Sequence, residues 1–244
     1  MWMQRWLGDI YSKLYHNFGL ETFKFSDALK ILGVDKDKLY VGFSHLHKHG
    51  VLTIYRRSRP RIYRLLNPSN YLIISSGYAK LIRVRQERYL NIIYDFYRSV
   101  KKRFRLRSYA IYGSIARGSA KYDSDIDILI ISDDFRGSLS RRLDELHICI
   151  EEVEDELQWL YRHEIYPTLS LYPLTSEEAV RIPLILLDIA YDAKIVYDDG
   201  FLSRLINIIH DRLSVLGAKR IQLEYDIWYW DLKPDYRLYE VVDI

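Results

Sequence analysis

The sequence of 244 residues contains one cysteine, Cys149, so no disulfide can form within the chain, as expected in a reducing cytoplasm. Glycine and proline are also scarce, at 11 and 6 residues, which is typical of a globular protein. No apolar run approaches the roughly 20 residues that a membrane-spanning helix needs. The first turns are interrupted by Arg5, Asp9 and Lys13, unlike a secretory signal. We therefore expect a cytoplasmic protein of one or two domains with no membrane partner.

Each half of the chain lacks a balance of charge, although the net charge of the whole is only +3. Residues 1–107 contain 22 Lys and Arg against 7 Asp and Glu, whereas residues 108–244 contain 14 against 26. A basic half favours a polyanion such as a nucleic acid as partner, and an acidic half favours bound cations. Alternatively, the two halves attract each other.

The first 67 residues carry the patterns of three helices followed by two short strands. The predicted helices cover 2–18, 26–32 and 36–49, and the predicted strands cover 51–55 and 61–65. Ser26 and Asp35 are the expected N-caps of the second and third helices. This order resembles that of winged helix-turn-helix domains, and the resemblance implies DNA binding by residues 1–67.

The predicted wing is rich in arginine, and the predicted third helix ends in alternating histidines. We expect four arginines of the wing to contact nucleic-acid phosphates: Arg56, Arg57, Arg59 and Arg61. His45, His47 and His49 have no acid or cysteine beside them, so a metal site is not favoured there. They are expected to edge the helix, within reach of DNA phosphates.

Residues 68–104 show a long helical pattern with apolar residues at steps of three and four. Its polar side is basic, from Lys80 to Arg103. We predict one helix that connects the two halves. The same helix is also a candidate surface for a homodimer.

The second half alternates strand-like and helix-like segments, which predicts an α/β domain with a small mixed sheet flanked by helices. The predicted strands cover 109–112, 125–131, 168–173 and 194–197, and the predicted helices cover 138–163, 176–190 and 201–216. We assign residues 105–200 to this domain. Residues 201–244, the last helix and an aromatic tail with some strands, are expected to pack on it. Trp228 and Trp230 are read as packing residues, with base stacking as the alternative.

The stretch YGSIARGSAKYDSDIDILIIS, residues 112–132, combines a glycine–serine pair after a strand with two aspartates at the start of the next strand. Gly113 allows the backbone to approach a ligand closely, and Ser114 adds a hydroxyl at the start of a helical turn. Asp125 and Asp127 share one face of a strand and repel each other unless a cation lies between them. The pattern predicts a divalent metal next to a bound phosphate.

This stretch resembles the signature of the DNA polymerase β-like nucleotidyltransferases in their minimal form, in which Gly-Ser precedes Asp-x-Asp by about ten residues. The resemblance implies transfer of a nucleoside monophosphate from ATP or another nucleoside triphosphate to a hydroxyl group. It also implies Mg²⁺ or Mn²⁺ held by the catalytic pair Asp125 and Asp127. Arg117 and Lys121, between the two parts of the motif, are candidates to bind the triphosphate, with salt bridges to nearby aspartates as the alternative.

The family's usual third carboxylate is missing, because the strand expected to carry it reads YPTLSLYPLT and has Ser170 at the matching position. Alternation along this strand places Thr168, Ser170 and Tyr172 on the face over the two aspartates. Asp188 and Asp192 are candidates to substitute, although solvated acids near a helix end are the more ordinary interpretation.

Two functions follow from these observations. The first is an enzyme that transfers AMP to a protein or a nucleic-acid acceptor, favoured by Gly113, Ser114 and the paired aspartates. The second is a DNA-binding transcriptional regulator whose nucleotidyltransferase-like domain only senses a nucleotide, favoured by Ser170.

Overall fold

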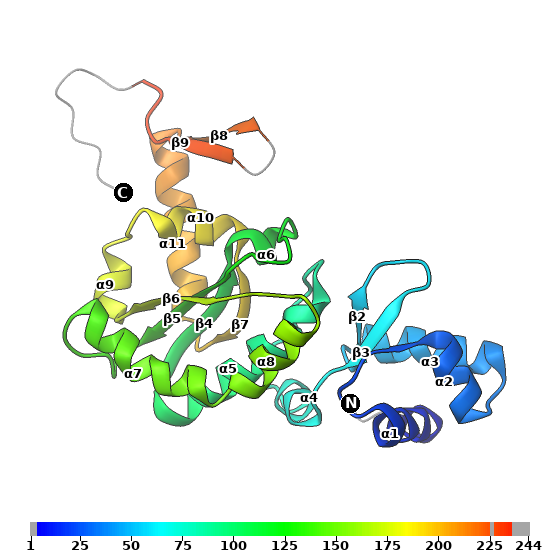
Figure 1. The fold of residues 1–244 in the computed structure, drawn as a ribbon. Helices are drawn as coiled ribbons and strands as arrows, with labels where there is room; N and C mark the ends of the chain where they lie inside the picture. Colours follow the sequence, from blue (N-terminus) through cyan, green and yellow to red (C-terminus); the bar gives the residue numbers. More distant parts are fainter. Residues whose placement is uncertain (1–3, 225–226, 236–244) are drawn as a thin grey trace. The chain divides into compact units, whose positions relative to one another are not determined.

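The computed structural model describes residues 4–224 and 227–235 (Figure 1). The chain divides into two compact units, Met1–Arg98 and Ser99–Ile244, with the boundary inside one helix. Trp2 of the predicted first helix and residues 236–244 of the predicted tail lie outside the described residues. Nowhere in the part that the structure describes is a helix both long and apolar enough to cross a membrane.

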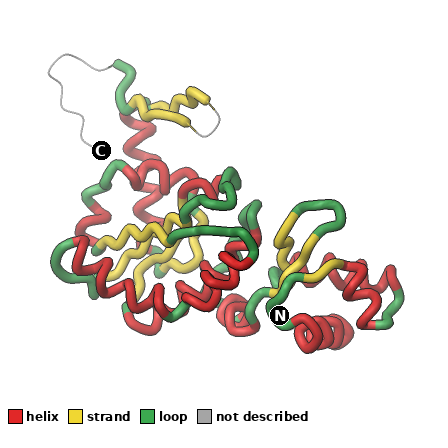
Figure 2. Tube along the Cα trace, viewed as in Figure 1, coloured by secondary structure: helices red, strands yellow, loops and turns green. Residues whose placement is uncertain are grey.

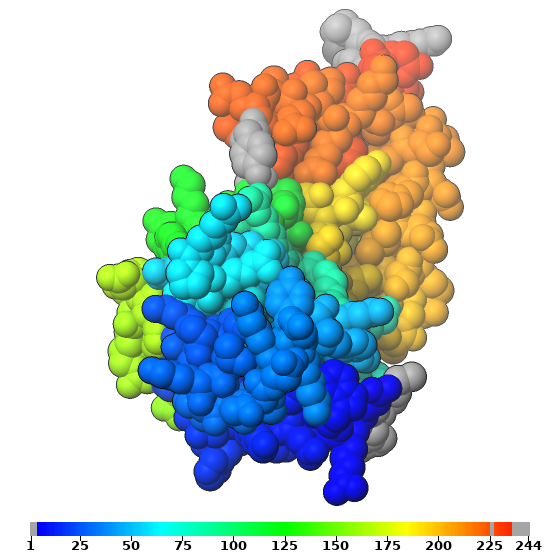
Figure 3. Space-filling model, turned by 90° about the vertical axis from the view of Figure 1, so that its right-hand side faces the viewer, coloured from blue at the N-terminus to red at the C-terminus, as the bar shows by residue number. Residues whose placement is uncertain are grey.

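The N-terminal unit packs three helices beside a small antiparallel sheet of strand order β1-β3-β2 (Figures 1 and 2). Its first elements are α1 (Arg5–Phe18), β1 (Phe23–Lys24), α2 (Phe25–Leu32), α3 (Lys36–Lys48), β2 (Leu52–Arg56) and β3 (Ile62–Leu65). The apolar stripes of the helices meet in one core that includes Leu14, Phe43 and Leu46. Figure 3 shows the surface of this unit in blue and cyan.

The two predicted helix caps differ in outcome. Asp35 caps α3, because its carboxylate accepts hydrogen bonds from the backbone N–H groups of Asp37 and Lys38, both at 2.9 Å. Ser26 does not cap α2, which begins at Phe25. There the Asp27 carboxylate accepts from the Lys24 backbone N–H at 3.0 Å. The order of three helices and a hairpin is present, and its assignment to winged helix-turn-helix domains stays a prediction.

The prediction of one helix over 68–104 is wrong. The segment contains α4 (Pro68–Ser75), a short 3₁₀ helix η1 (Glu87–Tyr89) and α5 (Leu90–Arg103), with residues 76–86 between them. Gly77, at φ 80°, follows the end of α4. In the segment after α4, tyrosine hydroxyls of α5 bond to backbone groups that a helix would bond internally. The Tyr94 hydroxyl accepts from the Ile82 N–H at 2.9 Å, and the Tyr97 hydroxyl donates to the Tyr78 carbonyl at 2.7 Å.

The apolar stripe that gave α5 its helical pattern is covered within the single chain. Ile92, Ile93, Phe96 and Val100 each have 0% exposure. This part of the stripe therefore offers no apolar surface to a second copy of the chain.

The C-terminal unit contains the predicted small mixed sheet flanked by helices, so that prediction is confirmed. The sheet has strand order β6-β5-β4-β7, with β5 and β6 parallel and the other pairs antiparallel. Its strands are β4 (Leu106–Tyr112), β5 (Ile126–Ser132), β6 (Leu169–Leu174) and β7 (Lys194–Asp198). Helices α7 (Leu139–Glu151) and α8 (Glu154–Arg162) lie on one face, and α9 (Ser176–Val180), α10 (Ile185–Asp192) and α11 (Phe201–Leu216) lie on the other (Figure 1).

Two predicted helices, 138–163 and 176–190, are each divided in two. Between α9 and α10, Pro183 has no N–H to donate, and Ile182 before it has φ 50°, so a helix cannot continue. Between α7 and α8, Val153 is buried at φ −113°, and its N–H bonds to the Ile150 carbonyl at 3.0 Å. The helix predicted over 201–216 matches α11, and the tail forms a hairpin of β8 (Lys219–Glu224) and β9 (Ile227–Asp231).

Candidate functional site

Gly113 and Asp127 are in direct contact at the end of the central strand pair. β4 and β5 are antiparallel, and Tyr112 is the register partner of Asp127, so Gly113 follows immediately beside that aspartate. Gly113 has φ 68°, and a Cβ added to it would lie 2.0 Å from Asp127 Oδ2. Only glycine fits this position, because both the backbone conformation and the space next to the carboxylate exclude a side chain.

Ser114 follows Gly113 in the short helix α6 (Gly113–Arg117), directly after β4. The Ser114 carbonyl accepts hydrogen bonds from the N–H groups of Gly118 and Ser119, both at 2.9 Å. The chain then turns away and returns through Ser124 to β5. This short return path brings the glycine–serine pair beside the two aspartates, as the spacing predicted.

Asp125 lies directly before β5 and Asp127 is its second residue, so the alternation of side chains places both on one face. Asp125 is exposed and accepts a hydrogen bond from the Thr168 hydroxyl, whereas Asp127 is half-buried. Burial raises the pKa of Asp127 above its ordinary value, and the negative charge of Asp125 acts in the same direction. A hydrogen bond from Ser170 and the positive charge of Arg117 oppose this rise in pKa. A cation bound at the pair would relieve the repulsion.

Ser170 occupies the position that the sequence assigned to the missing carboxylate. β5 and β6 are parallel, and Asp127 is the register partner of Ser170, so both side chains are on the same face of the sheet. The Ser170 hydroxyl hydrogen-bonds to the Asp127 carboxylate. Among residues 4–224 and 227–235, no three His, Cys, Asp or Glu side chains come together as a metal-holding group.

Arg117 lies at the end of α6, close enough to Asp127 to influence its pKa. Its guanidinium is 3.8 Å from Asp192 Oδ2, and it lies over the Trp228 ring at 4.6 Å from the centroid. Lys121 is exposed on the loop between α6 and β5, where its backbone N–H donates to the Ser124 hydroxyl at 2.8 Å. The positive charge of Arg117 reaches the aspartate pair, because it lowers the pKa of Asp127.

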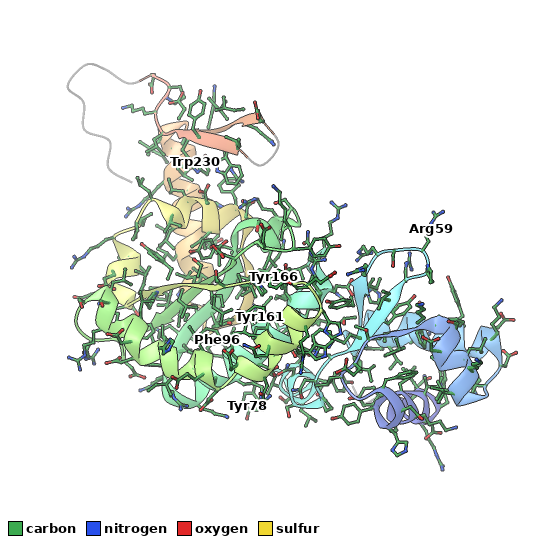
Figure 4. All side chains as sticks on the ribbon, viewed as in Figure 1. Arg59, Tyr78, Phe96, Tyr161, Tyr166 and Trp230 are labelled. Atoms are coloured by element: carbon green, nitrogen blue, oxygen red, sulfur yellow. The ribbon has the colours of Figure 1, made fainter. Side chains whose placement is uncertain are left out.

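Asp188 and Asp192, the candidate substitutes for the third carboxylate, both contact the β8–β9 hairpin. The indole N–H groups of Trp228 and Trp230 donate to Asp188 at 2.8 and 2.9 Å, and Arg220 donates to Asp192 at 2.7 Å. Figure 4 labels Trp230 where the hairpin meets the helices. The sequence did not reveal this cluster, since the partners are about 30 or 40 residues apart and no periodic pattern connects them.

The four wing arginines differ in their surroundings. Arg57 is exposed and pairs with Glu87 at 2.9 Å, and Arg56 is half-buried. Arg59 and Arg61 are exposed, and Figure 4 shows Arg59 at the tip of the β2–β3 connection, pointing outward.

Glu87 also contacts one of the three predicted histidines. Its carboxylate lies 3.0 Å from His47 Nε2, and it accepts from the Ile54 backbone N–H at 2.7 Å. His45 packs edge-on against Trp6, with ring centroids 6.1 Å apart. The role of Glu87, the single acid between Lys38 and Asp95, was missed, although its isolation in a basic segment was a signal.

Comparison with known protein families identifies the central part of the chain. Residues 93–182 match the family model of the nucleotidyltransferase domain. The match includes β4, α6, β5 and β6, and therefore Gly113, Ser114, Arg117, Lys121, Asp125, Asp127 and Ser170. Comparison with curated proteins finds no match.

Comparison with solved structures finds similarity to two toxin–antitoxin crystal structures. One is described as a toxin–antitoxin with AMP-PNP, at 13% identity and a TM-score of 0.33. The other is described as a mutant of the toxin–antitoxin MntA-HpeT, at 11% identity and a TM-score of 0.32. Each match covers 51% of this chain and 92% of the solved chain.

The segment that matches the nucleotidyltransferase model has the donors that a hard divalent cation needs. Mg²⁺ is usually bound by one or two carboxylates together with substrate phosphates and water. Asp125 and Asp127 supply two carboxylates on one face, and the bare Cα of Gly113 leaves room for the Asp127 carboxylate. The hydroxyls of Thr168 and Ser170 each hold one of these carboxylates. The residues present therefore fit such a cation.

We expect Gly113→Ala to destabilise the protein by about 3 kcal/mol or more. The new methyl group collides with Asp127, and the backbone of the alanine is held at a positive φ. Gly217→Ala is the matched control, since Gly217 has φ +67° and no atom within 4 Å of an added Cβ. The free energy of unfolding of the control should fall by about 1 kcal/mol, the cost of a positive φ in alanine. Urea unfolding of both variants measures the difference, and equal losses would contradict the close packing of Gly113 on Asp127.

Proposed function

We propose that the protein is a nucleotidyltransferase that uses Mg²⁺ or Mn²⁺ and transfers AMP from ATP to a hydroxyl of a protein or nucleic-acid acceptor. The observation that carries this proposal is the packing of Gly113 against Asp127, with Asp125 on the same face. The match of residues 93–182 to the nucleotidyltransferase domain supports the reaction class.

The residues around Asp127 have different roles in the proposed reaction. Asp125 and Asp127 would hold the divalent cation, which when bound neutralises charge on the phosphorus that is attacked. Ser114 and the backbone at the start of α6 orient the triphosphate. Arg117 and Lys121 offer positive charge to the pyrophosphate as it leaves. Arg117 is poised for this role by its present partners, Asp192 and Trp228, at the edge of the site.

The acceptor hydroxyl must lose its proton as it attacks the α-phosphorus. In a site with three carboxylates the third can accept this proton, and here that carboxylate is replaced by Ser170. Ser170 stands in register with Asp127 and takes no proton near neutral pH. Its hydroxyl instead lowers the pKa of the Asp127 carboxylate through a hydrogen bond. We therefore expect slow transfer, with the proton accepted by water or by a group of the acceptor.

The proposal is tested by incubating the full chain with ATP labelled on the α-phosphate and with Mg²⁺, in the presence of RNA or of candidate proteins. We expect pyrophosphate release and a labelled acceptor, and neither in the presence of chelator. Asp125→Asn should abolish both signals, and Asp123→Asn, in the same loop but outside the face of β5, should retain them. Release of no pyrophosphate with any acceptor would contradict the proposal.

Ser170 is the observation that favours a second candidate, a DNA-binding regulator whose C-terminal unit senses a nucleotide without transferring it. In that case ATP and Mg²⁺ bind and stabilise the chain, but no label moves and no pyrophosphate appears. The same incubation, combined with a melting curve, separates the two functions.

We also propose that the N-terminal unit is a winged helix-turn-helix domain that contacts nucleic acid. Its three helices and hairpin, its exposed Arg59 and Arg61, and the excess of basic residues over 1–107 support this assignment. Contacts to phosphate position a protein without reading sequence. Arg57 and His47 are less available for such contacts, because both face Glu87.

A further inference from the structure

A groove of about 660 Å³ lies within the N-terminal unit, between α2, α3 and the β2–β3 hairpin. Its volume is in the range of sites that bind small organic ligands. The lining combines aromatic rings with basic side chains, and those used below are Phe25, Lys36, Tyr40, Phe43, Arg61 and Tyr63. The helices α2 and α3 and the β2–β3 hairpin, which form the groove, are labelled in Figure 1.

The aromatic side chains of the groove form one continuous row. Tyr40 contacts Phe25, Phe25 contacts Phe43, and Phe43 contacts Tyr63, with centroid distances of 6.3, 5.0 and 5.1 Å and near-perpendicular rings. Phe43 is buried at 5% exposure and belongs to the core, whereas Tyr40 at the end of the row is 70% exposed. The Tyr40 ring is therefore accessible to a ligand, and it is positioned through Phe25 by the buried ring of Phe43.

The groove also carries positive charge, from the side chains of Lys36 and Arg61. Neither of these two side chains makes a hydrogen bond or an ion pair with any of residues 4–224 and 227–235. Both are exposed, one at the start of α3 and the other at the start of β3. An aromatic surface in a groove that also contains two such cations is complementary to a planar ring linked to an anionic group.

A nucleotide has this combination of a flat base and an anionic phosphate. Bases stack readily on exposed aromatic side chains, whatever their sequence, while basic groups follow the backbone. The bases of a duplex are stacked on each other and cannot lie on Tyr40. Only an unpaired base can therefore stack on this ring. The net charge of +15 over residues 1–107, from 22 basic and 7 acidic side chains, favours a polyanion over a single free nucleotide.

We propose that this groove binds an unpaired nucleotide of a single-stranded nucleic acid, with the base on Tyr40 and the phosphate between Lys36 and Arg61. The site is separate from the one around Asp127 and does not depend on the transferase activity. Contacts from the wing arginines to phosphates alone do not distinguish single strands from duplexes, whereas this site selects single strands.

The test measures binding of the full chain to fluorescein-labelled oligothymidine, alone and annealed to oligodeoxyadenosine, by fluorescence anisotropy. Tyr40→Ala should weaken binding of the single strand by about 5- to 100-fold, because one stacking contact is lost, and should leave duplex binding unchanged. Tyr40→Phe keeps the ring and should bind as the wild type does. Arg61→Gln should weaken binding and reduce the slope of log Kd against log salt by about 0.7, the amount expected for one phosphate contact to a single strand.

Two control variants match the exposure and the charge of the tested residues. Tyr78→Ala removes a tyrosine that is 67% exposed but does not line the groove, and Lys30→Gln removes one positive charge from an exposed position on α2. Both should retain single-strand binding within about 2-fold of the wild type, since surface substitutions away from a site have small effects.

Three outcomes would overturn the proposal. The first is no binding of the single strand at low salt. The second is equal weakening by Tyr40→Ala and Tyr78→Ala, or equal weakening of single strand and duplex by Tyr40→Ala. The third is displacement of the strand by free thymidine monophosphate at the same nucleotide concentration, which would make the groove a free-nucleotide site.

Discussion

Asp127→Asn should abolish the stabilisation of the protein by ATP and Mg²⁺ while leaving the unliganded fold intact. A ligand that binds only the native state at about 100 times its Kd adds about 2.7 kcal/mol. For a chain of this size, that corresponds to a rise in Tm of about 5–10 °C. Asparagine has the shape of aspartate but not its charge, so it still fits beside Gly113 and no longer attracts the cation. We expect the rise in Tm in the wild type only when ATP and the divalent cation are both present.

The variant without ligand should be at least as stable as the wild type. Asp127 is half-buried beside Asp125, and both burial and that neighbouring charge raise its pKa. The ionised carboxylate therefore destabilises the folded state at neutral pH, and asparagine removes this effect. Asp123→Asn, which removes an exposed charge from the same loop, should keep the full ligand-induced rise. An equal rise in the wild type and in Asp127→Asn would contradict a metal site at this pair.

The parts of the site that could be predicted from sequence are those fixed by short-range geometry. The run from Ile126 to Ser132 is buried along almost its whole length, so its apolar character alone indicates a central strand. Alternation then places Asp125 and Asp127 on one face, and the same rule places Ser170 on the matching face of β6. The short return path from Gly113 leaves the chain few ways to connect the two strands.

The parts that could not be predicted depend on partners distant in sequence. Residues 68–104 have a helical period throughout, yet the tyrosine hydroxyls of α5 satisfy the backbone of residues 78 and 82 in a non-helical path. Trp228, Trp230 and Asp188 come together across about 40 residues, and nothing local indicates it. Pro183 was a local signal of a break, but the apolar spacing around it outweighed that signal.

Ser170→Asp should raise the rate of transfer, because it restores a third carboxylate in register with Asp127. A positioned base typically contributes about 10²–10⁴-fold to such a step, so an increase of at least about 10-fold is expected. Thr168 lies just before β6 and Ser170 within it, and their hydroxyls already bond to Asp125 and Asp127. A carboxylate at position 170 would therefore reach the same cation and the same acceptor hydroxyl.

The added charge also predicts how the stability of Ser170→Asp depends on metal. Three carboxylates on one face repel each other in chelator, and the hydrogen bond from Ser170 to Asp127 is lost. We expect a loss of about 1–2 kcal/mol, or a Tm about 2–8 °C below that of the wild type, and recovery when Mg²⁺ is added. Ser170→Asn has the size of Ser170→Asp without the charge, so it should show neither the recovery with Mg²⁺ nor the gain in rate. If Ser170→Asp and Ser170→Asn behave alike in melting curves and in pyrophosphate release, position 170 does not face the reacting groups. If only Ser170→Asp transfers a nucleotide and the wild type does not, the natural protein is a nucleotide sensor that lacks its catalytic base.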